Sequence, residues 1–303
     1  MSDVKCMPCF ICNTQTEYFL KKDGYIYRMC ATCGLVFVCP QPKEEYLADE
    51  VYSEKAGYQK HRKKVAAKEN QHIKKILDFL NKNNIAGKLL DVGCSNGDFL
   101  YFAKQRGFEP YGVELNEFTA KVAQSRGLNI KKGTLKGARY ADNFFDVIFL
   151  GDIIEHVRDP RELLVECKRA LKTGGMLIIS TPNLDSFWAK ATFKLYTWFN
   201  IPWSVLTPPH HLFQFSENNL KQLLDDSGFT SMATWFRRPP TLKYELGSLH
   251  LWGKWRREKT FKNFLFMFSA FAVYTKVYIL DLLITPFKKK DFGMILCSKK
   301  IKN

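Results

Sequence analysis

The stretch that decides the fold is Leu89-Leu90-Asp91-Val92-Gly93-Cys94-Ser95-Asn96-Gly97-Asp98-Phe99-Leu100. Its apolar start predicts a buried strand, its two glycines predict a tight turn, and its end predicts the beginning of a helix. Glycine has no Cβ, so a ligand can approach the backbone at Gly93 and Gly97. The helix presents unpaired N–H groups and the positive end of its dipole to a negative group. The segment therefore predicts a ligand-binding loop after a strand.

A second acidic residue favours a nucleoside as the ligand. Glu114 ends a second predicted strand, at residues 110–114. An acid at this place can accept hydrogen bonds from both hydroxyls of a ribose, as in dinucleotide-binding folds. The dinucleotide fingerprint itself is absent, because it would require glycine where Ser95 and Asp98 stand. We expect a nucleoside cofactor that lies across the carboxyl ends of a parallel sheet.

The run DVGCSNG, residues 91–97, resembles the first motif of class I S-adenosylmethionine-dependent methyltransferases. Four later segments resemble further motifs of that family in the same order: residues 143–148, 155–160, 171–175 and 178–183. The resemblance covers roughly residues 70–240 and a last strand near 293–298. It implies an α/β, Rossmann-like sheet that is mostly parallel with an antiparallel last strand. Another Rossmann-like enzyme, or a relative that has lost activity, is the alternative.

The same resemblance implies S-adenosyl-L-methionine as the cofactor and assigns its contacts. They come from two strand ends and from the segment after the fourth strand: Asp91, Gly93, Cys94 and Gly97 around the amino-acid tail, Glu114 at the ribose, Leu115 at the adenine, and Asp152 at the ammonium. The family often has an acid after the third strand to bind the adenine amine. Gly133-Thr134 stands there in this chain, which puts that contact in doubt.

Three histidines are candidate catalytic bases: His156, His210 and His211. Methyl transfer is an in-line displacement, so the enzyme aligns the acceptor with the sulfonium and removes a proton if the acceptor is a hydroxyl. Histidine titrates near working pH and suits that task. A histidine that only fixes a loop is the alternative for His156. Glu155 and His156 could also ligate a divalent metal, but two ligands are too few to assign one.

The N-terminal region carries two CxxC pairs, Cys9 with Cys12 and Cys30 with Cys33. This spacing is typical of a tetrahedral Cys₄ zinc ribbon, in which the metal supplies folding energy that a small core cannot. We prefer Cys12 over Cys6 as the partner of Cys9, and free cysteines or a regulatory disulfide are the alternatives. Residues 30–42 resemble the leader of many bacterial small-molecule and sugar methyltransferases, where the ribbon is structural or helps to cover the substrate.

These motifs divide the chain into three parts. Residues 1–43 form the zinc-ribbon-like module, 44–86 a helical linker or cap, and 87–303 the methyltransferase domain with insertions at about 185–212 and 241–290. Strands are expected at 88–92, 110–114, 128–131, 145–150, 176–180, 232–236 and 294–298. Asn116 and Ser216 are expected to cap helices.

The two insertions point to the acceptor. Aromatic residues between 187 and 203 predict a lid, with a helical core extension as the alternative. Residues 264–284 contain only Lys276 and Asp281 as charges and approach a transmembrane signal. A single span would separate the last strand from its sheet, so we expect an interfacial helical hairpin. A buried helix pair or a dimer face is the alternative.

Composition limits the setting and the partners. The chain has 303 residues and a net charge of +16, which favours nucleic acid, anionic lipid or phosphorylated substrates as partners. Basic residues concentrate at 60–75 and around the second insertion, which predicts peripheral membrane contact through 256–290. No secretory leader is recognisable, and nine cysteines favour a reducing compartment. We expect a cytoplasmic protein, peripheral on the inner face of the membrane.

The leading hypothesis is methylation, first of all O-methylation, of a small or lipid-linked acceptor such as a sugar of a surface glycan or a prenyl-type intermediate. A ribosomal RNA base methyltransferase is the first alternative, since a Cys₄ ribbon and a basic chain suit it. The region after the fourth strand lacks an N-P-P-Y-like tetrapeptide, which weighs against it. A non-catalytic, cofactor-binding scaffold is the second alternative, and the intact Asp91, Gly93 and Glu114 weigh against it.

Overall fold

The computed structural model describes residues 7–43, 46, 69–199, 201, 203, 205–237, 260–284 and 291–301. Several predictions fall outside these residues: Cys6, most of the linker at 44–68 with its basic stretch, and the basic segments at 256–259 and 288–290. The linker is described from residue 69 onward, where helix α3 (Gln71–Lys82) lies as expected from its apolar stripe.

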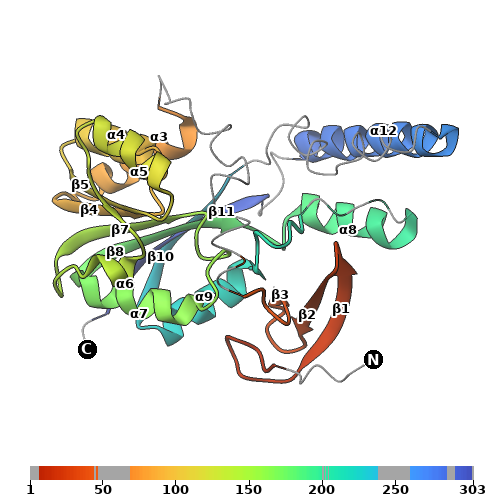
Figure 1. Ribbon diagram of the computed structural model, residues 1–303, viewed down its shortest axis with the longest axis horizontal. Coiled ribbons are helices and arrows are strands. Elements are labelled where there is room, and N and C mark those ends of the chain that lie inside the picture. Colours follow the sequence, from red (N-terminus) through yellow and green to blue (C-terminus); the bar gives the residue numbers. More distant parts are fainter. Residues whose placement is uncertain are drawn as a thin grey trace.

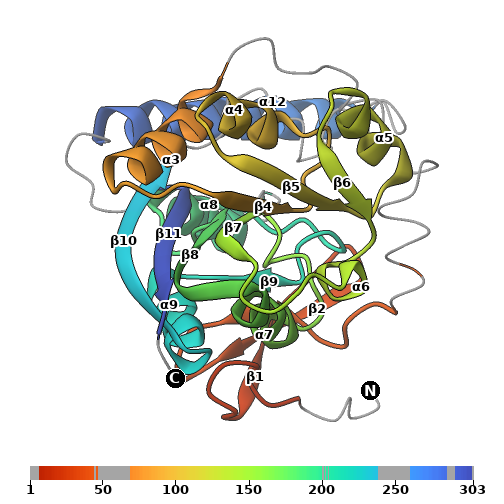
Figure 2. The same ribbon diagram turned by 90° about the vertical axis from the view of Figure 1, so that its left-hand side faces the viewer.

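A seven-stranded sheet forms the body of the protein (Figure 1, Figure 2). Its strands, in spatial order, are β10 (Phe229–Arg237), β11 (Gly293–Lys300), β8 (Leu171–Pro182), β7 (Phe145–Gly151), β4 (Lys88–Val92), β5 (Glu109–Glu114) and β6 (Asn129–Lys132). Strands β8, β7, β4, β5 and β6 pair in parallel, whereas β11 is antiparallel to both β8 and β10. The predicted sheet with an antiparallel last strand is confirmed.

Helices cover both faces of this sheet, which explains why its central strands are apolar along their whole length. Three helices lie above the sheet in Figure 1: α3, α4 (Asp98–Gln105) and α5 (Glu117–Ser125). Three lie below it: α6 (Leu135–Ala138), α7 (Pro160–Ala170) and α9 (Glu217–Asp226). The predicted caps are present, since Asn116 accepts from the N–H of Thr119 and Ser216 forms a capping box with Asn219.

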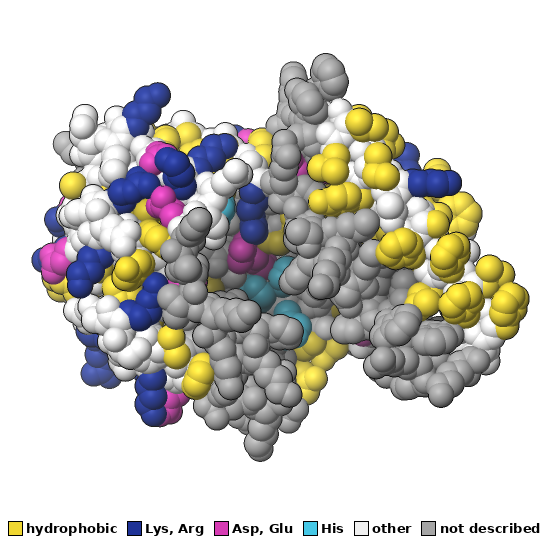
Figure 3. Space-filling model, turned by 90° about the horizontal axis from the view of Figure 1, so that it is seen from above, with side chains coloured by type: hydrophobic (Ala, Val, Ile, Leu, Met, Phe, Trp, Pro, Cys, Tyr) yellow, Lys and Arg dark blue, Asp and Glu magenta, His cyan; other side chains and the backbone are white. Residues whose placement is uncertain are grey.

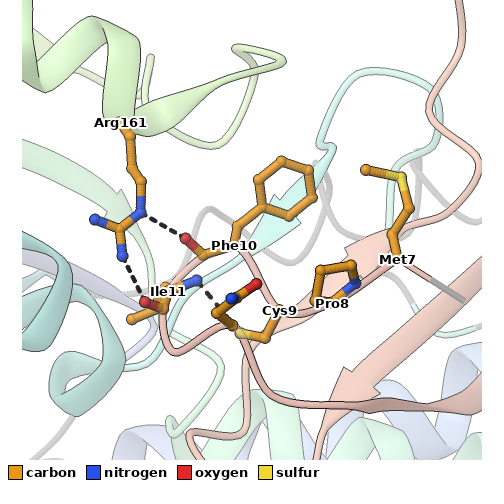
Figure 4. A pocket seen from close by; sticks show the side chains of 7 residues that line it. Met7, Pro8, Cys9, Phe10, Ile11 and Arg161 are labelled. Atoms are coloured by element: carbon orange, nitrogen blue, oxygen red, sulfur yellow. Dashed lines mark hydrogen bonds between the residues drawn. The ribbon is translucent and has the colours of Figure 1, made fainter.

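The N-terminal module forms a second sheet, and one strand of that sheet comes from the body of the protein. Strands β1 (Thr16–Lys22), β2 (Tyr25–Cys30) and β3 (Val36–Val38) pair antiparallel, and β3 then pairs with β9 (Phe213–Gln214). Arg161 of α7 donates hydrogen bonds to the carbonyls of Phe10 and Ile11, as Figure 4 shows. The ring of Phe10 packs edge-on against Phe213, with centroids 4.9 Å apart. The module is therefore joined to the body by hydrogen bonds and by aromatic packing.

Several aromatic residues of the first insertion build a core extension, which is the alternative to the predicted lid. Helix α8 (Phe187–Phe199) buries Trp188 completely, and its Phe193 stacks on Phe19 of the ribbon with centroids 5.3 Å apart. Trp203 is also buried and donates from Nε1 to the carbonyl of Ala189 at 3.1 Å. These contacts fill the junction between the ribbon and the body because aromatic side chains bury large areas there.

The described part of the second insertion is one continuous helix, so a hairpin within residues 264–284 is wrong. Helix α12 (Phe261–Ile284) has 24 residues and lies beside α8 (Figure 1). Its sequence has neither glycine nor proline, the residues that would have interrupted a helix. By length and composition Asn263–Ile284 could cross a membrane, and 17% of its most apolar window is buried.

Candidate functional site

The loop after β4 has the backbone that its sequence predicts. Gly93 and Gly97 have φ of 73° and 77°, in the left-handed region that favours glycine. A Cβ on Gly93 would lie 2.2 Å from Ile153 Cδ1, and one on Gly97 would lie 2.4 Å from Leu128 Cδ1. The positive φ favours glycine at both positions, and a Cβ at either would crowd a neighbouring side chain. The loop turns over the end of β5 and leads directly into helix α4.

Glu114 is held at the end of β5 in a fixed orientation. Its Oε2 accepts from the N–H of Ser95 at 2.7 Å, and its Oε1 accepts from the N–H of Asn116 at 2.8 Å. The side chain is buried, and each carboxylate oxygen retains a further lone pair. A carboxylate fixed in this way beside the glycine loop could accept hydrogen bonds from the two hydroxyls of a ribose, and that role of Glu114 stays a prediction.

The other predicted cofactor residues differ in which atoms they could present to a cofactor. Burial, and then the nearby charge of Glu114, raise the pKa of Asp91 well above its usual range. The thiol of Cys94 points into the core, where a Cβ on Gly112 would meet its Sγ at 2.7 Å. Only the backbone of Cys94 is left for a cofactor. Leu115 lies just past Glu114 and is 55% exposed, an arrangement open to a flat apolar group.

Two of the three predicted histidines meet Glu155 after β7. Glu155, His156 and His211 each offer one ligand atom, and these three atoms lie within 4.8 Å of one another. The rings of His156 and His211 meet edge-on, with centroids 4.7 Å apart. The N–H groups of Leu212 and Phe213 donate to the carbonyl of Glu155 at 2.8 and 3.1 Å, which joins the two loops.

The third histidine, His210, contributes its backbone. Its side chain is exposed, while its carbonyl oxygen lies 2.6 Å from Nδ1 of His156. A carbonyl can only accept, so Nδ1 of His156 carries the proton of this hydrogen bond. In neutral His156 the basic nitrogen is therefore Nε2.

Burial controls the protonation of the cluster. It raises the pKa of Glu155 to about 8, and the charge of Asp152 adds to that effect. The hydroxyl of Thr181 is close enough to favour the ionised form, but neither carboxylate oxygen makes a hydrogen bond of full geometry with the described residues. Burial also holds the pKa of His211 well below its usual range. Burial therefore favours the uncharged forms of Glu155 and His211 at neutral pH. The spacing of the three ligand atoms could hold a metal ion only with Glu155 ionised.

Sequence analysis missed an arginine at this site. Arg237, at the end of β10, forms an ion pair with Asp152, which also accepts from the Ser180 hydroxyl at 3.3 Å. A Cβ on Gly293 would lie 2.2 Å from Nε of Arg237, so the glycine makes room for the arginine. The register of β10 on β11 places Arg237 opposite Gly293, and no local pattern reveals it. Asp152 as a ligand of the cofactor ammonium stays a prediction.

Viewed from above, histidine and acidic side chains gather on the floor of one hollow (Figure 3). Strands β4 and β7 are neighbours, so the glycine loop and the Glu155 cluster follow adjacent strand ends. Ile153 of the second loop fills the space against Gly93 of the first. A cofactor on the glycine loop and an acceptor at the histidines would therefore meet at one edge of the sheet, where open α/β sheets bind their ligands.

The four ribbon cysteines also converge. The Sγ atoms of Cys9 and Cys33 lie 3.5 Å apart, those of Cys12 and Cys30 lie 3.4 Å apart, and all four lie within 4.8 Å of one another. Four thiolates gathered around one point have the ligand chemistry of a structural zinc site. The arrangement agrees with the preference for Cys12 as the partner of Cys9.

A mostly parallel sheet with a glycine loop after one strand and a buried acid at the end of the next is the arrangement of class I, S-adenosylmethionine-dependent methyltransferases. The profile of the Methyltransferase domain family matches residues 58–233, and the chain belongs to this family.

Curated relatives match only part of the chain. A ubiquinone biosynthesis O-methyltransferase of Pseudomonas fluorescens is 34% identical over 108 residues, 33% of this chain and 47% of that protein. An uncharacterized protein of Methanocaldococcus jannaschii is 30% identical over 123 residues, 40% of this chain and 58% of that protein. The match thus spans about half the length of these relatives.

Among solved structures, magnesium protoporphyrin IX methyltransferase from Synechocystis shares the fold. Its TM-score is 0.53 at 14% identity, with 85% of this chain and 100% of that chain covered. That structure contains bound SAH. The likeness concerns the fold.

Proposed function

We propose that this protein transfers a methyl group from S-adenosylmethionine to a hydroxyl of a small, lipid-linked acceptor. The observation that carries the proposal is the position of the glycine loop beside the cluster of Glu155, His156 and His211. The relatives named ubiquinone biosynthesis O-methyltransferase support O-methylation of a small molecule. The apolar face of α12 supports an acceptor that carries a lipid.

S-adenosylmethionine, when bound, supplies a methyl group on a sulfonium, and the electron pair of the broken S–C bond stays on sulfur while the O–C bond forms. Asp91 and the loop from Gly93 to Gly97 would bind its amino-acid end, and Glu114 would bind its ribose. The acceptor proton must leave as the new bond forms. We assign it to Nε2 of His156, because Nδ1 is committed to the carbonyl of His210.

His211 and Glu155 would support His156 as the base by their position beside it. The low pKa of His211 makes it a poor proton acceptor, so it remains a neutral ring edge-on to His156. Glu155 fixes the two loops relative to each other through its backbone carbonyl. Zinc at the four ribbon cysteines would stabilise strand β3, which pairs with β9 just after His211.

The His156→Gln variant tests the assignment of the base. With a membrane-lipid extract as the source of acceptor and methyl-labelled S-adenosylmethionine as donor, the rate should fall about 10²–10⁴-fold. Affinity for S-adenosylmethionine, measured by calorimetry, should stay unchanged because His156 lies on the acceptor side. Added imidazole should restore part of the rate of His156→Ala. An unchanged rate in both variants would exclude His156 as the base.

A further inference from the structure

Helix α12 has two faces of different character. One face is buried against the protein, with Ala270, Tyr274 and Asp281 fully covered. Tyr274 and Tyr278 meet Trp188 of α8 edge-on, at centroid distances of 5.7 and 6.0 Å. The opposite face is exposed and almost entirely apolar: Phe261, Phe264, Leu265, Phe268, Phe271, Ile279, Leu280, Leu282 and Leu283.

The exposed face is large for a surface helix. Its residues recur at the three- and four-residue spacing of one helical side, and 24 residues extend about 36 Å. Within the described side chains of α12 only Ser269 and Lys276 interrupt it as exposed polar groups. Figure 3 shows hydrophobic side chains gathered on the right, over α12. A contiguous apolar patch of this kind marks an interaction site.

The basic residues on either side of α12 in the sequence indicate what binds to this face. Arg256, Arg257 and Lys259 precede α12 in the sequence, and Lys288, Lys289 and Lys290 follow it. An apolar helix face with basic residues at both ends matches an anionic lipid surface, where acyl chains take the apolar side chains and headgroups take the cations. Helix α8, which packs on α12, ends in two more exposed aromatic residues, Trp198 and Phe199.

The packing of α12 and the course of the chain argue against a transmembrane orientation. A spanning helix would have lipid around it, but α12 is covered by protein near its middle and near its end, at Tyr274 and Asp281. The chain also leaves the sheet at Arg237 and returns at Gly293, which are paired neighbours. Residues 238–259 are too charged to recross a bilayer. An orientation of α12 parallel to the bilayer plane agrees with both observations.

We propose that the exposed face of α12 docks this protein in the plane of an anionic bilayer. The hollow with the histidine and acidic side chains is open in the same view that shows the apolar face of α12 (Figure 3). Docking would bring that hollow to the lipid headgroups, so the acceptor is a membrane lipid whose polar head carries the hydroxyl. This last step rests on the proposed methyltransferase function, whereas the docking itself does not.

Vesicle flotation of the full chain tests the docking. The wild type should float with vesicles of equal phosphatidylglycerol and phosphatidylcholine, and less with phosphatidylcholine alone or at high salt. Phe268→Glu combined with Leu283→Glu should weaken binding at least tenfold. Val165→Glu is the matched control, because Val165 is equally exposed on α7 and should leave flotation unchanged.

Two results would overturn the docking: a wild type that floats with neither vesicle, or a double variant that floats as well as the wild type. A wild-type dimer that the double variant converts to a monomer, without vesicle binding, would assign the face to a second copy of the chain. Calorimetry with S-adenosylmethionine on the same variants keeps the two proposals apart. Loss of flotation with unchanged cofactor affinity concerns α12 alone.

Discussion

At the scale of single residues, Glu114 combines a structural and a binding role. Its oxygens hold the N–H groups of Ser95 and Asn116 and keep lone pairs for a ligand. We predict that Glu114→Ala weakens S-adenosylmethionine binding by about 1–3 kcal/mol, the loss expected for hydrogen bonds to a charged group. Calorimetry measures this directly. Glu117→Ala, an exposed glutamate on the next helix, is the control. Equal affinities for both variants would refute the ribose assignment.

His72 of α3 should make folding sensitive to acid. Burial, with the charge of Arg237, lowers its pKa to about 4, whereas an unfolded histidine titrates near 6.5. Between these values the unfolded chain binds a proton that the folded protein does not, so stability is full above about pH 6.5 and falls toward pH 4. His72→Gln should remove at most about 3 kcal/mol of this loss. Denaturant unfolding at pH 7 and pH 4.5 checks it, and identical pH dependence in both proteins would contradict it.

The sequence could predict those site residues whose type is imposed by their immediate neighbours in the chain. Gly93, Gly97 and Glu114 were predictable because a turn and a strand end impose their own residue types. The role of Arg237 was not, since it depends on the partner strand that supplies Gly293. For the same reason the sequence could not show which of the three histidines is the catalytic base. Only the fold brings His156 to the carbonyl of His210 and separates the side chain of His210 from the cluster.

At the scale of elements, the ribbon and the acceptor site are connected through one short ladder. Strand β3 pairs with β9 at Phe37–Phe213 and Val36–Gln214, two residues beyond His211. The side chain of Asn219 also donates to the carbonyl of Cys33 at 3.3 Å. We therefore expect that a folded ribbon restricts the motion of the loop that carries His211. The expected module boundary at residue 43 separates sequence motifs, but the sheet of the ribbon continues into the body.

Loss of zinc should thus reduce turnover of the acceptor more than it reduces affinity for S-adenosylmethionine. We predict that Cys9→Ser loses the metal, because a tetrahedral site needs all four thiolates. Acceptor turnover should fall, while S-adenosylmethionine affinity should persist because the glycine loop lies on another strand. Metal analysis by mass spectrometry and calorimetry measure the two effects. Full zinc occupancy in the variant would refute the Cys₄ assignment.

The elements of the sheet were predictable because each carries its own pattern. Strands β4, β5 and β7 lie where apolar runs predict them, and Ser216 caps α9 as expected. The two insertions were not predictable in detail. Aromatic and apolar residues indicate burial or membrane contact equally well, and only the neighbours of α8 and α12 distinguish these outcomes. The absence of a turn residue within α12 was the available signal against a hairpin.

At the scale of the whole molecule, three parts converge on one edge of the sheet. The glycine loop would hold the methyl donor, the histidine cluster would face the acceptor, and the ribbon pairs with β9, which follows the loop that carries His211. The net charge of +16 would assist approach to an anionic surface, with α12 as the apolar contact. An RNA substrate would use the same charge but would leave the apolar face of α12 without a partner.

The most direct test of methyl transfer to a lipid-linked acceptor is a labelling experiment. The protein is incubated with methyl-labelled S-adenosylmethionine and a membrane-containing cell extract, with His156→Gln as the low-activity control, and the products are partitioned between organic solvent and water. We predict label in the organic phase with the wild type only. Label that stays in the aqueous phase and disappears on nuclease treatment, or no label in either phase, would contradict the account.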